Sequence, residues 1–406
     1  MTKEKIMELY ARYVSPGKVE MYKKYDIALV PHKRRGVFLY DITGKRYINC
    51  HCNGGVFNLG HRNKKIMDAV KKAMQRYDIG NHHLISQPKA MLAQKLAATM
   101  PAGLNQVVYG VSGGEAIDTA IKLARAVTGR PNIISAIGGY HGHTGLALAT
   151  GDEKFKKPFE PLSPGFVQVP FNDVEAMKAV INEQTAAVIL ETIPATLGIV
   201  VPHKDYFRQV CKLCHNHGAL FIMDEVQTGF GRTGKLWGFE HFDVVPDIVV
   251  MGKGMSGGVY PITATVYKED YAYFFKENPF IHISTFGGSE ISCFAAMAVL
   301  DMCDSYLLNH VNQIADYFTK KLTVLSSQYP KASFTVRGLG LMMGLAFNDE
   351  MTALFMVKLL FDNGVYVVYS GNDPKVIQFL PPLIITKEEA DLVITAIEKS
   401  LQALSQ

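Results

Sequence analysis

Residues 220–227 read LFIMDEVQ, and residues 248–254 read IVVMGKG. Each stretch opens with four apolar residues and ends in polar or small ones, which is typical of a buried strand that runs into a turn. A carboxylate at the end of a buried strand is costly to leave unpartnered, so Asp224 needs a cation or hydrogen-bond donors. A protonated pyridine nitrogen would be such a cation. Lys253, among glycines, would have a lowered pKa if buried and would act as a nucleophile toward an aldehyde.

The surrounding sequence, from residue 105 to about 270, alternates between apolar runs and helix-like stretches. Apolar runs alternating with helices indicate a mostly parallel sheet covered on both faces, so we expect an α/β fold with ligands beyond the carboxyl ends of the strands. Besides 220–223 and 248–251, the expected strands are 106–109, 132–135, 187–190 and 262–266, and a helix is expected over 116–126.

The two ends of the chain differ from this middle part. The first 45 residues and those after about 300 lack the regular alternation, and a closing helix is expected from Thr386 to Leu404. We therefore expect a large domain over residues 46–300 and a smaller α+β domain formed by residues 1–45 together with 301–406.

Composition narrows the class of protein. The chain has 406 residues and a net charge of +5, but its 42 Lys and Arg are scattered among 37 Asp and Glu, which argues against nucleic-acid binding. The first residues are charged, no apolar run is long enough to span a bilayer, and the six cysteines suggest reduced thiols, so we expect a cytoplasmic protein. Cys211, Cys214 and His215 would share a helix face, but a single C-x-x-C is weak evidence, so we expect buried thiols and no metal.

Two motifs nearly match phosphate-binding loops. Residues 252–257, GKGMSG, follow an apolar strand as a dinucleotide fingerprint does, but GVYP at 258–261 cannot continue the required helix. Residues 229–235, GFGRTGK, are one residue short of a P-loop, and Leu236 stands where a hydroxyl must hold magnesium. We expect neither nicotinamide or flavin binding nor nucleotide hydrolysis.

A third segment is more informative about phosphate. Residues 109–116, YGVSGGEA, lead from a strand through small residues into a helix expected to begin near Glu115. Backbone N–H groups and the positive end of the helix dipole would suit a phosphate there. A tight turn that needs glycine for backbone reasons alone explains the same residues.

Together these segments resemble the class III aminotransferases, the pyridoxal-phosphate family that includes ornithine and 4-aminobutyrate aminotransferases. The resemblance covers most of the chain. Its blocks, in family order, are NLGH (58–61), SGGEA (112–116), YHG (140–142), DEVQTGFGRTG (224–234), GKG (252–254) and STFGG (284–288). It implies the aspartate-aminotransferase-like fold, with a mostly parallel seven-stranded sheet in the large domain.

The resemblance also implies roles for individual residues. Lys253 would form the Schiff base with the cofactor and then move the proton during the reaction, and Asp224 would keep the pyridine nitrogen protonated. Tyr140 and Val226 would cover the two faces of the ring, and Gln227 would bind its phenolic oxygen. Further cofactor-binding residues are Ser112, Gly113, Gly114, His141, Glu191 and Thr285. Because Thr285 would reach the phosphate of the neighbouring subunit, a homodimer is implied.

The sequence departs from the family at two residues that would bind the substrate. Members that use α-amino acids or 2-oxoglutarate usually carry an Arg where this chain has Gln378, and a Glu that pairs with it where this chain has Thr196. Gln and Thr cannot clamp an α-carboxylate, so we expect an amine, a β- or ω-amino compound, or a substrate with phosphate or sulfonate further from the reacting carbon. Asn53 is a further candidate for the substrate pocket, as are His82 and His83, although ordinary packing or surface placement is the favoured explanation for each of these three.

The expected activity is transfer of an amino group to an α-keto acid. Because the usual keto-acid clamp is missing, a lyase, epimerase or racemase with the same cofactor is the alternative, since those reactions also begin with a substrate carbanion. A binding protein with the same fold but no catalytic activity is a third interpretation. The presence of Lys253, Asp224 and Gln227 argues against it.

Overall fold

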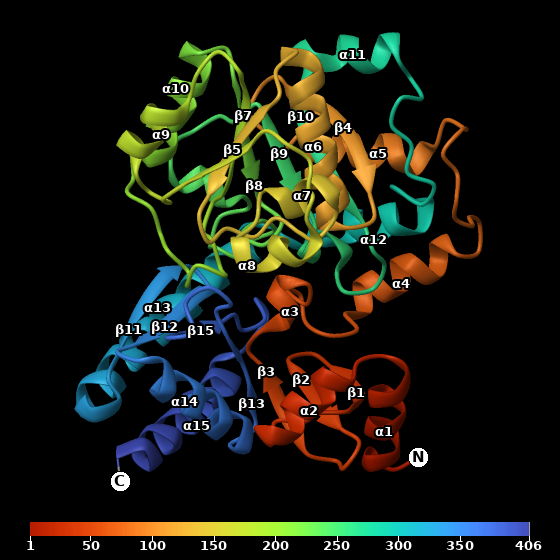
Figure 1. Ribbon diagram of the computed structural model, residues 1–406. Helices are drawn as coiled ribbons and strands as arrows, with labels where there is room; N and C mark the ends of the chain where they lie inside the picture. Colours follow the sequence, from red (N-terminus) through yellow and green to blue (C-terminus); the bar gives the residue numbers. More distant parts are fainter. Residues whose placement is uncertain (406) are drawn as a thin grey trace.

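A twisted seven-stranded sheet forms the upper half of the molecule in Figure 1. The computed structural model describes residues 1–405. The strands lie in the order β4-β10-β9-β8-β7-β5-β6. Their bounds are β4 (Leu104–Gly110), β5 (Asn132–Ala136), β6 (Phe166–Val169), β7 (Thr185–Glu191), β8 (Leu220–Asp224), β9 (Ile248–Met251) and β10 (Thr263–Lys268).

The pairing confirms a mostly parallel sheet. Strands β6, β5, β7, β8 and β9 run parallel to one another, and β10 runs antiparallel to both β9 and β4. All six strands expected from the apolar runs are present. The strand pattern did not reveal β6, a short edge strand that reads FVQV, because its first three residues are only partly buried or exposed and leave no continuous apolar run.

Both faces of the sheet are covered, as continuously apolar strands require. In β8, Ile222 packs in one apolar cluster with α6 (Gly113–Thr128), whereas Phe221 and Met223 pack in the other with α10 (Tyr206–Asn216). The other helices around the sheet are α4 (Lys64–Ala73), α5 (Gln87–Ala97), α7 (Gly145–Ala149), α8 (Glu153–Lys156), α9 (Val174–Val180), α11 (Ala272–Glu277) and α12 (Glu290–Met302).

Helix α6 begins two residues before the expected start at Glu115. Ser112 is its N-cap, and the Ser112 hydroxyl accepts a hydrogen bond of 3.3 Å from the Glu115 N–H. The cap allows Gly113 and Gly114 to form the first turn, so their N–H groups have no acceptor within the helix. The N-terminal end of α6, which carries these free N–H groups, therefore faces the carboxyl ends of the strands.

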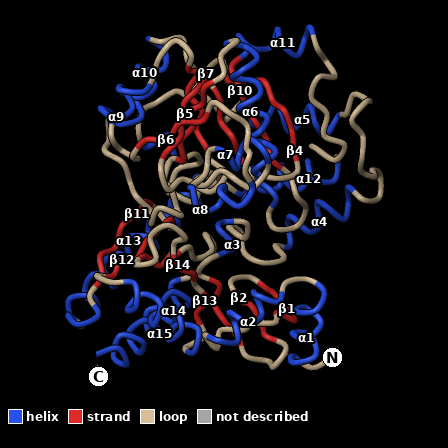
Figure 2. The backbone as a smooth tube through the Cα atoms, viewed as in Figure 1, coloured by secondary structure: helices blue, strands red, loops and turns tan. Residues whose placement is uncertain are grey.

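The lower half of the molecule contains the N-terminal and C-terminal segments of the chain, which lie next to each other, with the two termini at opposite sides in Figures 1 and 2. One four-stranded sheet has the order β1-β2-β3-β13 and the other β11-β12-β15-β14. The strands are β1 (Pro31–Arg35), β2 (Phe38–Asp41), β3 (Arg46–Asn49), β11 (Phe334–Leu339), β12 (Met342–Phe347), β13 (Val365–Tyr366), β14 (Val368–Tyr369) and β15 (Val376–Phe379). The helices are α1 (Lys3–Tyr13), α2 (Pro16–Lys24), α13 (Ser305–Gln328), α14 (Glu350–Asp362) and α15 (Lys387–Ser405).

Helix α15 confirms the expected closing helix to within one residue at each end. The Thr386 hydroxyl accepts from the Glu389 N–H at 3.2 Å, and the Glu389 carboxylate accepts from the Thr386 N–H at 2.9 Å, which fixes its start.

The domain limits at 45/46 and 300/301 stay a prediction. Because β3 pairs with β2 and with β13, we propose moving the first limit to just after Asn49.

No single helix in residues 1–405 is both long and apolar enough to cross a membrane. Helices α12 and α13 would reach the required length and composition only as a pair bent by 66°. All six cysteines are free and buried.

Candidate active site

The carboxyl ends of β7, β8 and β9 and the first turn of α6 enclose a cavity of about 380 Å³. Its lining includes ten of the eleven residues expected to bind the cofactor, all except Thr285. The lining residues are Ser112, Gly113, Gly114, Tyr140, His141, Gly142, His143, Thr144, Glu191, Asp224, Val226, Gln227 and Lys253. Residues from five separate segments thus meet at the edge where open α/β sheets bind ligands.

Asp224 is buried at the end of β8 and is held from two sides. Its Oδ2 lies 2.7 Å from Nδ1 of His141, and its Oδ1 accepts a hydrogen bond of 2.9 Å from the Val226 N–H. Burial disfavours the charged form of His141, but the hydrogen bond and charge of Asp224 outweigh it and raise the pKa of His141. The pair therefore favours a proton on His141, on the nitrogen that faces the Asp224 carboxylate.

Glu191 ends β7 and lies directly beside Asp224 in the register of the sheet. Its Oε1 accepts a hydrogen bond of 2.9 Å from the Tyr140 N–H, which fixes the loop that carries Tyr140 and His141. Burial raises the pKa of Glu191 to about 7, with a further contribution from the charge of Asp224. Glu191 therefore positions the loop and limits the negative charge at the strand ends.

Lys253 follows β9 in a left-handed backbone conformation, with φ of +40°, that side chains other than glycine rarely adopt. Its Nζ donates a hydrogen bond of 3.1 Å to Oε1 of Gln227. Burial lowers the pKa of Lys253, although the carboxylates of Asp224 and Glu191 oppose the shift. An amine with a lowered pKa, fixed at the floor of a cavity, is suited to attack a carbonyl group.

Two buried nitrogens at this cavity have no hydrogen-bond partner within residues 1–405. They are Nε2 of Gln227 and Nε2 of His141. Buried donors without acceptors are rare in native proteins and usually indicate a ligand or water that is not seen. The cavity therefore has the polar groups to hold a molecule that carries hydrogen-bond acceptors.

The glycines at the start of α6 leave room for a ligand and for close packing. A Cβ on Gly114 would lie 2.6 Å from the Thr144 hydroxyl, and one on Gly113 would lie 3.4 Å from Val226. Together with the unpaired N–H groups of the first helical turn, this geometry suits a phosphate or another anion.

The residues expected to line a substrate pocket lie apart from this cavity. Gln378 is buried in β15 and donates a hydrogen bond of 3.3 Å to the Ala195 carbonyl, and Thr196 donates one of 3.0 Å to the Gly138 carbonyl. Asn53 is exposed and lines a second cavity.

Three other candidates lie outside both cavities. The rings of His82 and His83 lie against each other, with centroids 4.2 Å apart. Thr285 is exposed and does not reach the cofactor cavity of its own chain.

Gly54 is a site residue that the sequence reading missed. A Cβ at this position would lie 3.2 Å from Cε of Lys253 and 3.7 Å from Nε2 of Gln227. Residues 52–55 all have positive φ, including the non-glycine residues Cys52 and Asn53. The Gly-Gly pair at 54–55 was the available signal, but only the three-dimensional structure brings it against Lys253.

The acid next to Asp224 has a different task. The carboxylate of Glu225 accepts hydrogen bonds from the hydroxyls of Thr192 and Thr228 and from the N–H groups of Gly238 and Phe239. Glu225 therefore holds the loop after β8 in place, whereas Asp224 faces the cavity.

The two near-match phosphate motifs have structural explanations. Within 229–235, Arg232 is fully buried and donates to Oδ1 of Asn58 and to the carbonyls of Leu341 and Pro381. Residues 253–256 form only one short 3₁₀ turn, which ends at Gly257. Neither segment starts a helix at a phosphate site.

The Cys211-Cys214-His215 cluster lies on α10. Both cysteines are buried, and Nε2 of His215 lies 2.9 Å from the Asp247 carboxylate. Within residues 1–405, no group of three or more His, Cys, Asp or Glu side chains could hold a metal ion.

Comparison with known proteins identifies the family. The family model "Aminotransferase class-III" matches residues 21–401. An "uncharacterized aminotransferase" of Archaeoglobus fulgidus is 49% identical over 406 residues, covering 100% of this chain and 95% of the relative.

Solved structures agree with this assignment, and they too are aminotransferases by name. An ornithine aminotransferase of Toxoplasma gondii, with pyridoxal phosphate at partial occupancy in its active site, has a TM-score of 0.90 and 28% identity, covering 99% of this chain and 95% of that one. An acetylornithine aminotransferase of Elizabethkingia anophelis has a TM-score of 0.82 and 31% identity, covering 96% and 99%. The chain belongs to the class III aminotransferases, and its activity is pyridoxal-phosphate-dependent transamination.

Proposed function

We propose that the amino donor is an amine, or an amino acid whose acidic group is not attached to the carbon that carries the amino group. The observation that carries this proposal is the pairing of Gln378 and Thr196 with backbone carbonyls. Both side chains are neutral, and each already donates a hydrogen bond to a backbone carbonyl of the protein. Neither supplies the two parallel N–H donors with which an arginine binds a carboxylate.

We assign the cofactor to the cavity that Lys253 and Asp224 line. The unpartnered Gln227 Nε2 supports a hydrogen bond to an oxygen of the cofactor ring, and the paired Asp224 and His141 support binding of its protonated nitrogen. Bound there, pyridoxal phosphate supplies an aldehyde that exchanges amino groups and a ring that withdraws electrons from the carbon bearing the amine.

The protein's own groups then have distinct tasks. Lys253 would hold the cofactor covalently and would serve as the base that moves a proton at the substrate carbon, a task for which its lowered pKa is suited. Asp224 would direct its carboxylate toward the ring nitrogen, and His141 fixes the orientation of that carboxylate. Tyr140 and Val226, which both line the cavity, are positioned to exclude water from the two faces of the ring.

We infer that the phosphate lies at the first turn of α6 and that the active unit is a homodimer. Ser112, Gly113 and Gly114 offer backbone N–H groups there. Thr285 lies in an exposed loop whose neighbours Phe280, Ile281, Ile283 and Phe286 are between 47% and 60% exposed, and Ile85 is fully exposed. An apolar surface of this kind supports a partner subunit that would bring its own Thr285 to the phosphate. The six free cysteines support a cytoplasmic location.

The donor proposal is tested with cofactor-loaded protein and matched panels of amines and α-amino acids. Formation of one oxo product per site, measured without any keto acid, is the expected result for amines and β- or ω-amino compounds. Efficient exchange between glutamate and 2-oxoglutarate would contradict the proposal. Repeated turnover of a donor without a keto acid would instead indicate the lyase or epimerase alternative.

A double variant tests the role of the two neutral side chains. Gln378→Arg alone buries a cation without a partner, so we expect a loss of about 3 to 5 kcal/mol of stability. Gln378→Arg combined with Thr196→Glu should regain most of it and increase the use of glutamate, because Gln378 contacts the residue next to Thr196. Additive losses of stability would contradict this interpretation.

A further inference from the structure

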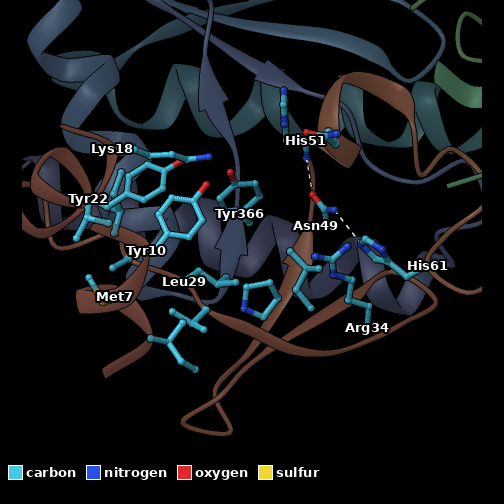
Figure 3. A pocket seen from close by; sticks show the side chains of 18 of the residues that line it. Met7, Tyr10, Lys18, Tyr22, Leu29, Arg34, Asn49, His51, His61 and Tyr366 are labelled. Atoms are coloured by element: carbon cyan, nitrogen blue, oxygen red, sulfur yellow. Dashed lines mark hydrogen bonds between the residues drawn. The ribbon is translucent and has the colours of Figure 1, made fainter. Parts of the chain in front are cut away.

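A second cavity, of about 470 Å³, lies between helices α1 and α2 and the sheet that contains β2 and β3. Figure 3 shows Tyr10, Tyr22 and Tyr366 lining one side of it, with Arg34 and His61 on the other. Its remaining wall is mostly aliphatic and includes Leu29. A cavity of this size with aromatic and aliphatic walls can hold an extended organic group.

One end of this cavity lies one residue away from a backbone segment that packs against Lys253. His51 and Asn53 line it, and the next residue, Gly54, lies against Lys253. The left-handed backbone of residues 52–55 holds this segment between the two cavities, with Lys253 lining the cofactor cavity on the other side. A substrate whose amino group reaches Lys253 could therefore extend its other end past Gly54 into the second cavity.

The positive charge of the protein is concentrated around this cavity. Residues 1–46 contain eleven Lys and Arg and five Asp and Glu, whereas residues 47–406 contain 31 and 32. The N-terminal segment thus carries +6, more than the +5 of the whole chain. None of the lining residues, all of which fall in the described part of the chain, is Asp or Glu. Such a surface attracts anions.

Two of the lining residues are cations that lack an ionic partner. Lys18 Nζ lies 5.9 Å and 5.8 Å from the ring centres of Tyr10 and Tyr22, and Arg34 lies 5.9 Å from that of Phe57. Within residues 1–405, neither cation forms a salt bridge with a carboxylate (Asp26 and Asp41, for example, pair with other lysines). The aromatic rings favour these positions of the two cations while leaving their N–H donors available.

The polar residues between these cations and Lys253 are uncharged at neutral pH. Burial lowers the pKa of His51 to about 4 and that of His61 to about 4. Asn49 links them, because its Nδ2 lies 3.0 Å from Nε2 of His61 and its Oδ1 accepts from the His51 N–H at 3.2 Å (Figure 3). An anionic group is therefore favoured at Lys18 and Arg34, and less so beside Lys253.

We propose that the second cavity binds the distal arm of the amine substrate, an apolar or aromatic arm that ends in a carboxylate or a phosphate held by Lys18 and Arg34. This inference rests on the proposed function, because it takes Lys253 as the point of reaction. It also fits the neutral pair Gln378 and Thr196, since an anion bound at the far end removes the need for a clamp near the reacting carbon.

The test compares pairs of amines that differ only at the far end. Cofactor-loaded protein is mixed with 8-aminooctanoate or with the neutral 8-aminooctanamide, and with 8-aminooctyl phosphate, and the rate of oxo product formation is measured at subsaturating amine. We expect the two anionic amines to react roughly 25-fold faster than the amide, since each exposed cation contributes about five-fold. The ratio should fall as salt is added.

Variants assign that ratio to named residues. Lys18→Met and Arg34→Met should each reduce the ratio of anionic to neutral amine about five-fold. Arg35→Met is the matched control, because Arg35 is an exposed cation of the same strand as Arg34 but does not line the cavity, so its ratio should equal that of the wild type. Titration of cofactor-free protein with octanoate and octanamide by calorimetry should show the same preference without any reaction.

The outcomes separate this inference from the proposed function. Two results would overturn the distal-arm proposal while leaving the donor proposal intact. One is formation of oxo product from all the amines at equal rates. The other is an Arg35→Met variant in which the ratio of the rates with anionic and neutral amines falls as much as in Arg34→Met. No product from any amine, with product from α-amino acids, would overturn both. A change of oligomeric state in the Lys18 and Arg34 variants, with no change in the ratio, would mean that the cavity belongs to a subunit contact and would also overturn it.

Discussion

Gly54 controls how closely the backbone approaches Lys253, so the Gly54→Ala substitution should reduce the rate of reaction as well as the stability. The added Cβ would lie 3.2 Å from Cε of Lys253, which forces that side chain to shift by a few tenths of an ångström. The shift would disturb the 3.1 Å hydrogen bond that Nζ of Lys253 donates to Gln227. We expect the rate constant for amine conversion to fall roughly tenfold.

Gly129→Ala is the matched control for this substitution. Gly54 and Gly129 both have φ of +67°, but a Cβ on Gly129 would meet nothing within 4 Å. Each substitution should lower the free energy of unfolding by about 1 to 2 kcal/mol, because the left-handed conformation is unfavourable for alanine. Urea unfolding measures that loss, and single-turnover kinetics measure the rate. A Gly54→Ala protein with the stability loss of Gly129→Ala but a wild-type rate would show that a Cβ at position 54 does not disturb Lys253.

Three further predictions concern the carboxylates and the surface. Asp224→Asn should lower the rate of amine conversion by roughly 10² to 10³-fold with an unchanged unfolding transition, whereas Glu225→Gln should mainly lower stability; a normal rate in Asp224→Asn would contradict its role. Burial raises the pKa of Glu191 from 4.5 to about 7. In the cofactor-free protein, the stability that Glu191 contributes is therefore full below pH 4.5 and is lost as the pH rises to about 7. Urea titrations of Glu191→Gln should lack this loss of stability. Ile85→Glu should produce monomers in sedimentation experiments while the exposed control Met351→Glu should not; a dimeric Ile85→Glu protein would count against the proposed interface.

The central sheet could be predicted from sequence because its strands are continuously apolar. Residues 220–223 and 248–251 face apolar clusters on both sides, so four apolar residues in a row were required and were visible. The edge strand β6 has a partner on one side only and carries a half-buried Gln168, so it gave no such signal. The same reasoning explains why β1, whose five residues are all exposed, was not predicted.

The cofactor cavity could be predicted because its residues lie in short, distinctive segments next to predicted strands. Asp224 and Lys253 follow β8 and β9 directly, and Glu191 ends β7. Gly54 and His51 could not be assigned in this way, because their position near Lys253 depends on how the lower half of the molecule packs against the sheet. Lys18 and Arg34 likewise come to line one cavity only in the folded chain, because they lie 16 residues apart in sequence, on α2 and β1.

The most direct test of the account is the site of covalent attachment of pyridoxal phosphate. Protein saturated with the cofactor is treated with borohydride, digested, and examined by mass spectrometry. We expect the cofactor's mass on the peptide that contains Lys253, and its loss in Lys253→Ala, with no other lysine of residues 1–405 modified in proportion. A peptide containing unmodified Lys253 in fully loaded protein, or stoichiometric attachment at another lysine, would contradict it.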